Sequence, residues 1–211
     1  MENVIENKVA EYLLQIKAIK LQPANPFTWA SGWISPIYCD NRKTLSYHEV
    51  RTYIRDSFVE VIRKNYPDVE LIAGVATGAI AHGALVAEAM GLPFVYIRAE
   101  AKKHGLENLV EGEVKPGQKA VVIEDLISTG GSSLKAFNAL KESGAVVLGM
   151  AAIFSYQFPV AQKNFDEAGC KLVTLSNYHA LTNFALQTGY IDATHTETLA
   201  KWRTSPDTWG K

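Results

Sequence analysis

Short apolar runs alternate with segments of helical periodicity over the last two thirds of this chain. They predict strands near residues 70–74, 93–97, 119–124, 146–153 and 171–175, with helices between most of them near 79–90, 132–143 and 158–168. Strands that are apolar throughout are typical of a parallel sheet covered on both faces by helices. We therefore predict an α/β fold with a mostly parallel sheet, in which ligands collect at the carboxyl ends of the strands.

The N-terminal part has a different pattern. Apolar side chains recur at helical spacing over residues 4–18 and again over 46–65, which predicts two amphipathic helices. Between them, residues 27–38 contain Pro and Gly at positions that exclude a helix, and they favour short strands or an extended lobe. We expect this segment to form a small lobe beside the sheet.

The C-terminal tail predicts two more helices, near 182–188 and 194–203. Thr194 and Glu197 have the spacing of a capping box at the start of the second helix. We expect one structural domain overall, with three parts: an N-terminal helix and hood lobe over 1–45, an α/β core over 46–178 and a helical tail over 179–211.

Composition excludes several classes of function. A chain of 211 residues with a formal net charge of −1 lacks the basic surface that nucleic-acid-binding proteins usually show. No apolar run approaches the length of a membrane span, and the polar start at Met1 lacks a signal-peptide pattern. Cys39 and Cys170 are far apart and lack a metal-ligand spacing. We expect a cytoplasmic protein without a disulfide or zinc site, and without nucleic-acid or membrane partners.

The strand near 119–124 leads into an unusual string. Glu124 and Asp125 end the apolar run, the loop Ser128-Thr129-Gly130-Gly131 follows, and Ser132 opens a helix. The glycines allow a tight turn, and the first N–H groups of the helix point back at the loop as a cradle for phosphate. Carboxylates repel phosphate, so this pair would not bind a phosphate group itself. It suits hydroxyl groups, or a metal ion, on a molecule that carries its phosphate elsewhere, such as a phosphorylated sugar. The alternative is a turn and N-cap that binds nothing.

Two other strand ends also carry residues that are suited to binding a ligand. The turn Gly74–Ala79 has small residues whose backbone N–H groups suit a diphosphate, although the same residues also ease helix packing, and His82 is expected to pack or lie at the surface. The segment 98–105 carries Arg98, Lys102 and His104. It is either a solvated charged loop or a lid over a leaving diphosphate. Three such ends in one sheet favour an enzyme.

Together these strings resemble the orotate phosphoribosyltransferases, a family with the type I phosphoribosyltransferase fold. The resemblance covers nearly the whole chain, and it rests on residues 27–32, on 35–42 with their Ser-Pro-Ile-Tyr string, on 74–79, on 98–105 and on 124–132. It implies the transfer of a phosphoribosyl group from phosphoribosyl diphosphate (PRPP) to orotate. The products are orotidine 5′-monophosphate and diphosphate, in pyrimidine biosynthesis, and the reaction uses Mg²⁺.

The resemblance also implies roles for individual residues. The implied catalytic residues are Asp125, Glu124, Lys102, Arg98 and His104. The implied PRPP-binding residues are these five together with Ala76, Thr77, Leu126, Ile127, Ser128, Thr129, Gly130, Gly131 and Ser132. Ser128, Tyr38 and Cys39 are implied to contact orotate. Mg²⁺ comes mainly with PRPP, so no protein metal ligand is implied. In the family the lid closes over the neighbouring subunit's site, which implies a homodimer.

The chain departs from the family at three places. Ala99 and Glu100 stand where members carry a lid lysine, Ala30 stands at another lysine position, and residues 154–157 lack an arginine that one branch uses for orotate. The partner of the orotate carboxylate is therefore unassigned. Two other functions stay open: a phosphoribosyltransferase for another base, and a non-catalytic regulator that senses PRPP.

Overall fold

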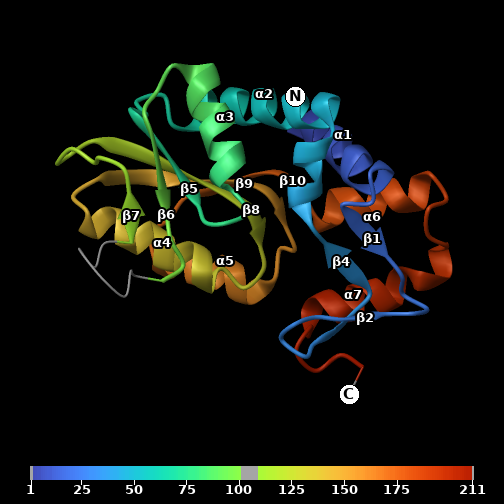
Figure 1. Cartoon of the computed structure of the whole chain (residues 1–211). Helices are drawn as coiled ribbons and strands as arrows, with labels where there is room; N and C mark the ends of the chain where they lie inside the picture. The colour runs from blue at the N-terminus through green and yellow to red at the C-terminus, as the bar shows by residue number, and fades with distance from the viewer. Residues whose placement is uncertain (1, 101–108, 211) are drawn as a thin grey trace.

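The computed structural model describes residues 2–100 and 109–210 (Figure 1). Within them the main sheet has six strands in the order β10-β9-β8-β5-β6-β7, all parallel to their neighbours except β7. The strands are β5 (Leu71–Val75), β6 (Phe94–Ile97), β7 (Val110–Glu111), β8 (Lys119–Ile127), β9 (Val146–Ser155) and β10 (Leu172–Asn177). The predicted α/β fold and its mostly parallel sheet are confirmed.

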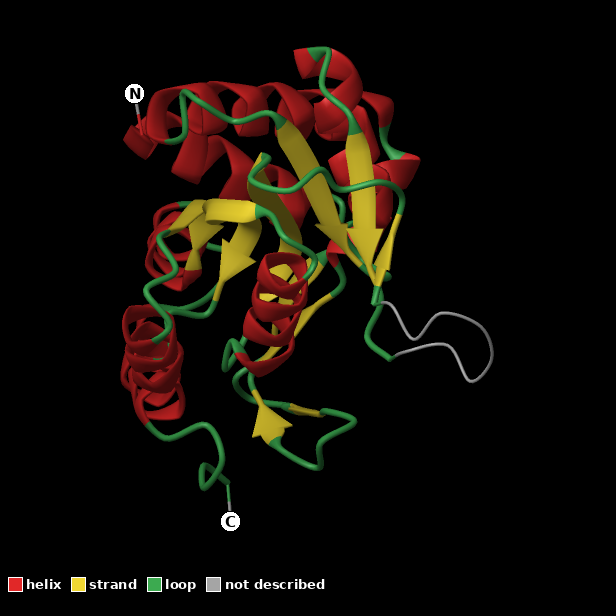
Figure 2. Ribbon diagram, turned by 90° about the vertical axis from the view of Figure 1, so that its left-hand side faces the viewer, coloured by secondary structure: helices red, strands yellow, loops and turns green. Residues whose placement is uncertain are grey.

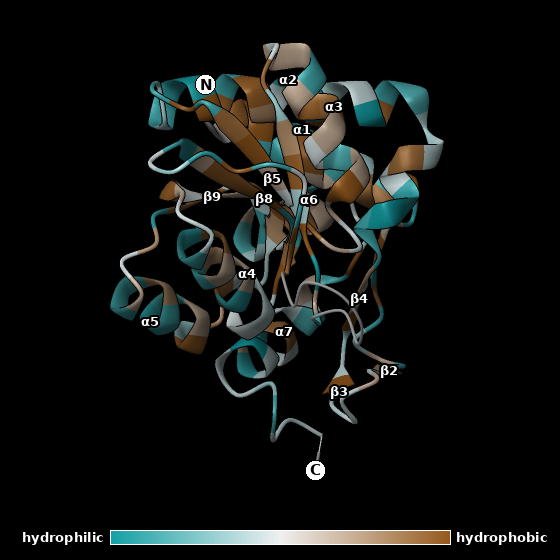
Figure 3. Cartoon of the chain, turned by 60° about the vertical axis from the view of Figure 1, so that its left-hand side comes forward, coloured by the Kyte–Doolittle hydropathy of each residue, from teal (hydrophilic) through white to brown (hydrophobic). Residues whose placement is uncertain are grey.

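Helices cover both faces of the sheet, as Figures 1 and 2 show. One face carries α1 (Glu2–Gln15), α2 (His48–Asn65) and α3 (Ile80–Met90), and the other carries α4 (Gly131–Glu142) and α5 (Pro159–Glu167). All five residues of β5 are buried, and the central strands form the apolar middle of the protein in Figure 3. This burial on both faces explains why the sequence there is apolar without alternation.

Glycine allows α3 to lie close to the sheet. A Cβ at Gly83 would come within 2.7 Å of the Phe94 ring, and one at Gly74 would come within 2.8 Å of the Ala79 carbonyl oxygen. Larger residues at these two positions would force the helix away from β5. The small residues at Gly74 and Gly83 therefore serve packing, as one of the two interpretations of the turn Gly74–Ala79 predicted.

Strands β8 and β9 are longer than the sequence predicts. They pair beyond the expected ends, with Leu126 opposite Phe154 and Ile127 opposite Ser155. Glu124, the last residue of the predicted strand, and Asp125, just beyond its predicted end, both lie within β8. The sequence pattern ended the strand at the first polar residues, whereas the backbone ladder with β9 continues through them.

The N-terminal lobe is built from very short strands. β1 (Ile19–Leu21) pairs antiparallel with β4 (Ile37–Cys39), β2 (Phe27–Thr28) pairs antiparallel with β3 (Ile34–Ser35), and the 3-10 helix η1 (Asn41–Ser46) leads into α2. We call residues 19–46 the hood. The prediction of short strands in this segment is confirmed.

The tail packs against the hood through aromatic rings. Its helices are α6 (Tyr178–Gln187) and α7 (Thr196–Thr204), joined by the 3-10 turn η2 (Ala193–His195). Trp202 of α7 is fully buried, with ring centroids 5.8 Å from Trp29 of the hood and 5.7 Å from Tyr156. Trp202 of the tail therefore braces the hood, whereas α6 packs against α1.

The ends of the tail helices differ from prediction. α6 begins at Tyr178, four residues before the predicted start, because the Asn177 side chain accepts a hydrogen bond of 3.0 Å from the Ala180 amide. The predicted capping box at Thr194 is wrong. The Thr194 amide donates instead to the Asp192 carboxylate at 2.8 Å, and α7 starts at Thr196 without a side-chain cap. Asp192 lies closer along the chain and takes the amide first.

Candidate active site

A cavity of about 330 Å³ lies where β5 and β8 end. It is lined by Val75, Ala76, Thr77, Gly78, Glu124, Asp125, Leu126, Ser128, Thr129, Gly130 and Ser132. Two of the three strand ends singled out in the sequence thus meet around one space, as expected for ligands of a parallel sheet. A larger hollow of about 530 Å³ beside Leu109 and Glu142 carries no loop of this kind.

Glu124 is the buried member of the carboxylate pair. Its side chain is 5% exposed, and it accepts hydrogen bonds from the Ser133 hydroxyl at 2.9 Å and from the Asp125 amide at 3.0 Å. Burial, and then the neighbouring Asp125 charge, raise the pKa of Glu124 from 4.5 to about 8. In the free protein this carboxyl group is therefore neutral over much of the physiological pH range, and a bound cation or hydroxyl would favour its ionised form.

Asp125 is half-buried beside the turn after β5. A Cβ at Gly78 would overlap the Asp125 carboxylate, so only glycine lets the turn lie this close. The Asp125 backbone carbonyl accepts a hydrogen bond of 2.6 Å from the Asn41 side chain of η1. Asp125 therefore has contacts with the turn of the sheet on one side and with the hood on the other.

The loop after β8 has the predicted tight turn. Gly130 has φ +84, and a Cβ there would lie 2.8 Å from the Phe165 ring, so both its backbone and its surroundings require glycine. Asn164 of α5 holds the loop by donating to the Thr129 carbonyl at 3.0 Å. α4 starts at Gly131, so its first N–H groups face the cavity. Of the predicted loop residues, Ile127 and Gly131 do not line the cavity.

Arg98 lies at the base of the predicted lid and does not line the cavity. Its guanidinium is 3.3 Å from the Glu111 carboxylate on β7, and its amide donates to Leu109 at 2.8 Å. Lys135 of α4 donates to the carbonyl of Ala99 at 2.9 Å. The other predicted lid residues, Lys102 and His104, lie outside the described residues.

Comparisons with known proteins agree with this geometry. Residues 43–188 match the family described as Phosphoribosyl transferase domain. Orotate phosphoribosyltransferase from Porphyromonas gingivalis is 61% identical over 202 residues, which are 96% of this chain and 96% of the relative. The chain belongs to the orotate phosphoribosyltransferase family.

Solved structures of the orotate phosphoribosyltransferase family share the fold. The crystal structure of orotate phosphoribosyltransferase from Aeropyrum pernix is 26% identical, with a TM-score of 0.75 over 87% of this chain and 99% of that one. UMP synthase from Leishmania donovani is 22% identical and has a TM-score of 0.78. The match covers 93% of this chain and 42% of that longer protein, and it shows the fold alone.

The hood residues predicted to contact orotate lie beside the cavity rather than on its wall. Tyr38 is 42% exposed and packs near Phe27, with 5.7 Å between ring centroids. The Cys39 thiol donates a hydrogen bond of 3.3 Å to the Asn41 side-chain oxygen. Burial, and then the charge of Asp125, raise the pKa of Cys39, so the thiol is protonated and unsuited to act as a nucleophile. In this member of the orotate phosphoribosyltransferase family, Cys39 therefore makes a structural contact with Asn41.

Sequence reasoning missed two residues of the site. Asn41 was part of a matched string without a role, and Gly78 was only one small residue in a turn, yet both contact Asp125. Neither contact leaves a local pattern, because Asn41 is 84 residues from Asp125 along the chain. His82 was expected to pack or to lie at the surface; it is buried and bonds to Thr44, which is the first of these two.

Over residues 2–100 and 109–210, no three His, Cys, Asp or Glu side chains gather closely enough to hold a metal ion. Glu124 and Asp125 are the two carboxylates that line the cavity. Over the same residues, no helix has the length and apolar character that crossing a membrane requires.

Proposed function

We propose that the protein transfers the 5-phosphoribosyl group of PRPP to orotate, giving orotidine 5′-monophosphate and diphosphate in pyrimidine biosynthesis. One observation carries the proposal: the carboxylate pair on β8 and the loop at the start of α4 line one cavity, with the turn after β5 opposite them. A sugar that bears a phosphate at one end and a diphosphate at the other matches these three parts. The 61% identity to an orotate phosphoribosyltransferase supports orotate as the acceptor.

The loop holds the 5′-phosphate of the substrate in this proposal. Ser128, Thr129 and Ser132 line the cavity and offer hydroxyl donors, and the first N–H groups of α4 add the partial positive charge of a helix start. Both kinds of group favour a doubly charged phosphate. Ser128 is also proposed to contact the incoming base.

The carboxylates act on the ribose. Asp125 faces the cavity and accepts hydrogen bonds from the ribose hydroxyls. Its negative charge stabilises the positive charge that develops on the ribose ring as the bond to diphosphate breaks. Glu124 stays protonated until a ligand arrives, because its buried charge is unfavourable in the free protein. The backbone at Ala76 and Thr77 then faces the leaving diphosphate from the other side of the cavity.

Mg²⁺ fits this site as an ion that enters with the substrate. The cavity offers two adjacent carboxylates, which are hard oxygen ligands, and fewer than the six that Mg²⁺ requires. Diphosphate and hydroxyl oxygens of PRPP would supply the rest. An ion held there would neutralise charge on the leaving diphosphate, while Glu124 and Asp125 orient the ribose.

The lid, the dimer and the location are further parts of the proposal. Lys102 and His104 are proposed to close over the diphosphate of the partner subunit's site, with Arg98 at the base of the lid, which makes a homodimer the active form. Arg98 is held by Glu111 at 3.3 Å and leaves this partner on closing. Both cysteines are free, which suits the cytoplasm.

Orotate consumption by the purified protein tests the reaction. PRPP is supplied with and without Mg²⁺, and uracil, adenine and hypoxanthine replace orotate as controls. We expect turnover with orotate alone and only with Mg²⁺. Turnover of another base would move the specificity away from orotate, and PRPP binding without any turnover would support the regulator that senses PRPP.

Mixing two inactive variants tests the lid across subunits. Lys102→Ala removes a lid cation and Asp125→Asn removes the ribose carboxylate, so each homodimer has two damaged sites. A mixed dimer whose lids act in trans regains one intact site, and we expect activity to return on mixing. Mixtures as inactive as the parents would rule out a lid shared between subunits.

A further inference from the structure

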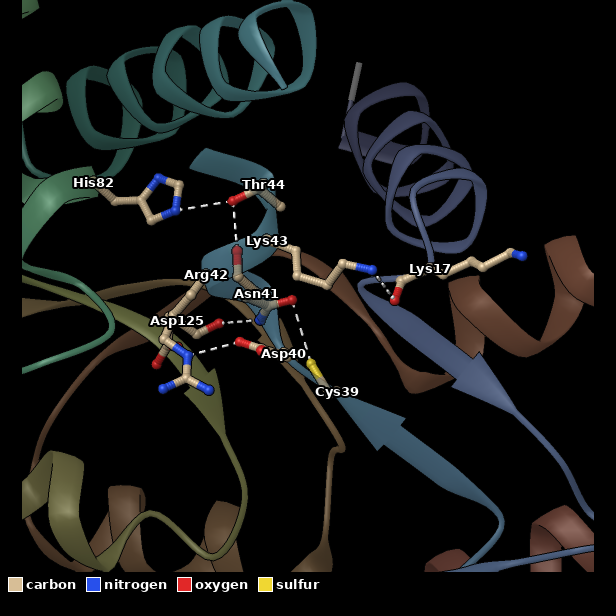
Figure 4. A network of polar contacts seen from close by, with 9 residues as sticks. All are labelled: Lys17, Cys39, Asp40, Asn41, Arg42, Lys43, Thr44, His82 and Asp125. Carbon is tan, nitrogen blue, oxygen red and sulfur yellow. Dashed lines mark hydrogen bonds and ion pairs between the residues drawn. The ribbon is translucent and has the colours of Figure 1, made fainter. Parts of the chain in front are cut away.

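Asn41 is clamped through three of its polar groups. It is 1% exposed, its side-chain nitrogen donates to the Asp125 carbonyl at 2.6 Å, and its side-chain oxygen accepts from the Cys39 thiol at 3.3 Å. Its own backbone carbonyl accepts from the Thr44 hydroxyl at 2.6 Å. Figure 4 shows these contacts meeting between the hood and β8. A buried amide held at both ends of its side chain has little freedom to move.

Thr44 connects Asn41 to α3. The Thr44 hydroxyl has one hydrogen, which it donates to Asn41, so the His82 ring nitrogen 3.0 Å away must be the donor in the Thr44–His82 contact. His82 is 1% exposed, and burial lowers its pKa to about 4, which keeps the ring neutral with its proton on Nε2. The chain of donors thus runs from His82 through Thr44 to Asn41.

The other side of η1 is anchored as well. The Lys43 ammonium donates to the carbonyls of Ile16 and Lys17, at 3.0 and 3.1 Å, where α1 has ended (Figure 4). Both carbonyls belong to the first residues after α1, which ends at Gln15. η1 is therefore fixed against both α1 and α3, and it is a rigid support for the Asn41 side chain.

Where Asn41 contacts β8, this strand is paired with a neighbouring strand on one side only. β5 pairs with β8 only as far as Gly74 opposite Ile123, whereas β8 continues to Ile127 with β9 alone. Asp125 lies in this one-sided stretch, and there its carbonyl accepts the Asn41 amide. Asn41 thus replaces a neighbouring strand at the residue that faces the ribose.

We propose that Asn41, held by Thr44 and His82, is a positioning residue that sets the place of Asp125 and links the hood to the ribose site. This inference rests on the proposed function for its kinetic part. It adds that the hood does more than border the base: its η1 turn fixes the carboxylate that acts on the sugar. Loss of the link moves Asp125 while leaving the phosphate loop intact.

Asn41→Asp is the sharpest test, because it keeps the shape and removes the donor. Burial favours a protonated carboxyl group, which could still donate, so the variant is assayed at a pH high enough to ionise it. The ionised carboxylate beside the Asp125 carbonyl can only accept, and kcat with orotate relative to the wild type should then fall about 10- to 100-fold, the range in which misplacing a reacting group acts. The Kd for PRPP should stay within about threefold, because the phosphate loop is untouched. A wild-type kcat in this variant, or equal losses in kcat and PRPP binding, would overturn the proposal.

Asn177→Asp is the matched control. Asn177 is also buried but does not line the cavity, and its side chain accepts a hydrogen bond of 3.0 Å from the Ala180 amide and donates one of 3.0 Å to Glu6. It should lose stability and keep kcat. A loss of kcat as large as that of Asn41→Asp would show that any buried asparagine gives the effect, and would overturn the assigned role.

Thr44 supplies a second pair of variants in case Asn41→Asp does not fold. Thr44→Val removes the hydroxyl at nearly constant shape and should lower kcat, whereas Thr44→Ser keeps the hydroxyl and should restore it. Equal activity in the two would contradict the proposed chain of donors.

Hydrogen exchange gives a readout that does not depend on turnover. The amides of residues 124–127 should exchange faster in Asn41→Asp than in the wild type or in Asn177→Asp, since Asn41 supports this stretch. Unchanged exchange would overturn the positioning role. If Asn41→Asp speeds this exchange but the wild-type protein consumes no orotate, the positioning role stands and the proposed reaction is rejected.

Discussion

The two sides of the cavity differ in what holds them in place. The sheet side, residues 75–78 and 124–132, sits on β5 and β8, whose backbone pairing with their neighbours fixes the strand ends. The hood has strands of two or three residues, and side chains hold it against the rest of the protein: Asn41 on Asp125, Thr44 on His82, and Trp29 on the ring of Trp202. Chemistry that needs a fixed geometry lies on the side held by backbone.

The difference also separates chemistry from selection of the base. Groups on the sheet side can meet phosphate and ribose, which every phosphoribosyl transfer shares. In the proposed reaction the hood side borders the base, which differs between enzymes, and the hood is held by contacts that a few substitutions could change. Changes on the sheet side should therefore act mainly on kcat, and changes in the hood should act on stability and on the KM for the base.

The largest effect should come from Asp125→Asn on the sheet side. Removing the charge takes away stabilisation that is strongest in the transition state, so kcat should fall about 100- to 1,000-fold. The Kd for PRPP should change by less than about threefold, because ground-state binding rests on the phosphate loop. Turnover at saturating substrates and PRPP titration check this. Equal losses in both quantities would assign Asp125 to binding alone.

A steric change at Gly78 tests the same side from the opposite strand. Gly78→Ala places a Cβ where the Asp125 carboxylate lies, and should lower kcat about 10- to 100-fold by displacing it. Gly83→Ala is the control: its Cβ would lie 2.7 Å from the Phe94 ring in the packing of α3. That variant should lose about 1–3 kcal/mol of stability and keep kcat. Similar kcat values for the two variants would contradict the distinction.

The same difference decides what the sequence could predict. The strands and the Gly130 turn were predictable, because apolar runs and a glycine at φ +84 are local requirements of the chain. The carboxylates were found for the same reason, since they follow directly on the apolar part of β8. What the backbone ladder fixes is therefore visible in a short stretch of residues.

Contacts between distant side chains left no such pattern. Asn41 bonds to Asp125 across 84 residues and Thr44 to His82 across 38, so no spacing rule could pair them. At Thr194 a local rule was available and still failed, because the neighbouring Asp192 took its amide. The hood was predicted as a set of short strands, but what holds it against the sheet could come only from the structure.

Trp202→Phe weakens the hood and should have the next largest effect. The Trp202 indole nitrogen has no hydrogen-bond partner among the described residues, so this change removes ring area and no hydrogen bond. We expect a loss of about 1–3 kcal/mol in the free energy of unfolding. The KM for orotate should rise more than the KM for PRPP, because Trp202 packs on Trp29 of the hood.

Trp209→Phe is the control for this change in the same tail. Trp209 is half-buried at the edge of the core, so we expect a change within about 0.5 kcal/mol and unaltered KM values. Urea unfolding and initial rates at varied orotate measure both variants. A Trp202→Phe protein with a lower kcat and an unchanged KM for orotate would break the division between the two sides.

The smallest expected effect is the pH dependence of stability that Glu124 causes on the sheet side. This carboxyl group is held in a buried place where its ionised form is unfavourable. Its pKa is raised from 4.5 to about 8, so between these pH values the folded protein keeps a proton that the unfolded chain has released. The free energy of unfolding should therefore fall as the pH rises through this window.

Glu124→Gln resembles the protonated carboxyl group and keeps its contacts with Ser133 and the Asp125 amide. It should flatten the fall and, near the upper end of the window, raise Tm by roughly 2–4 °C for each kcal/mol gained. Thermal unfolding of the ligand-free protein across the window measures this, with Glu197→Gln on the exposed face of α7 as the control that leaves the slope unchanged. An undiminished slope in Glu124→Gln would mean that the pH dependence comes from other groups. A flattened slope would show that the sheet side holds a buried acid whose ionisation costs stability, the form that a cation or hydroxyl bound in the cavity would favour.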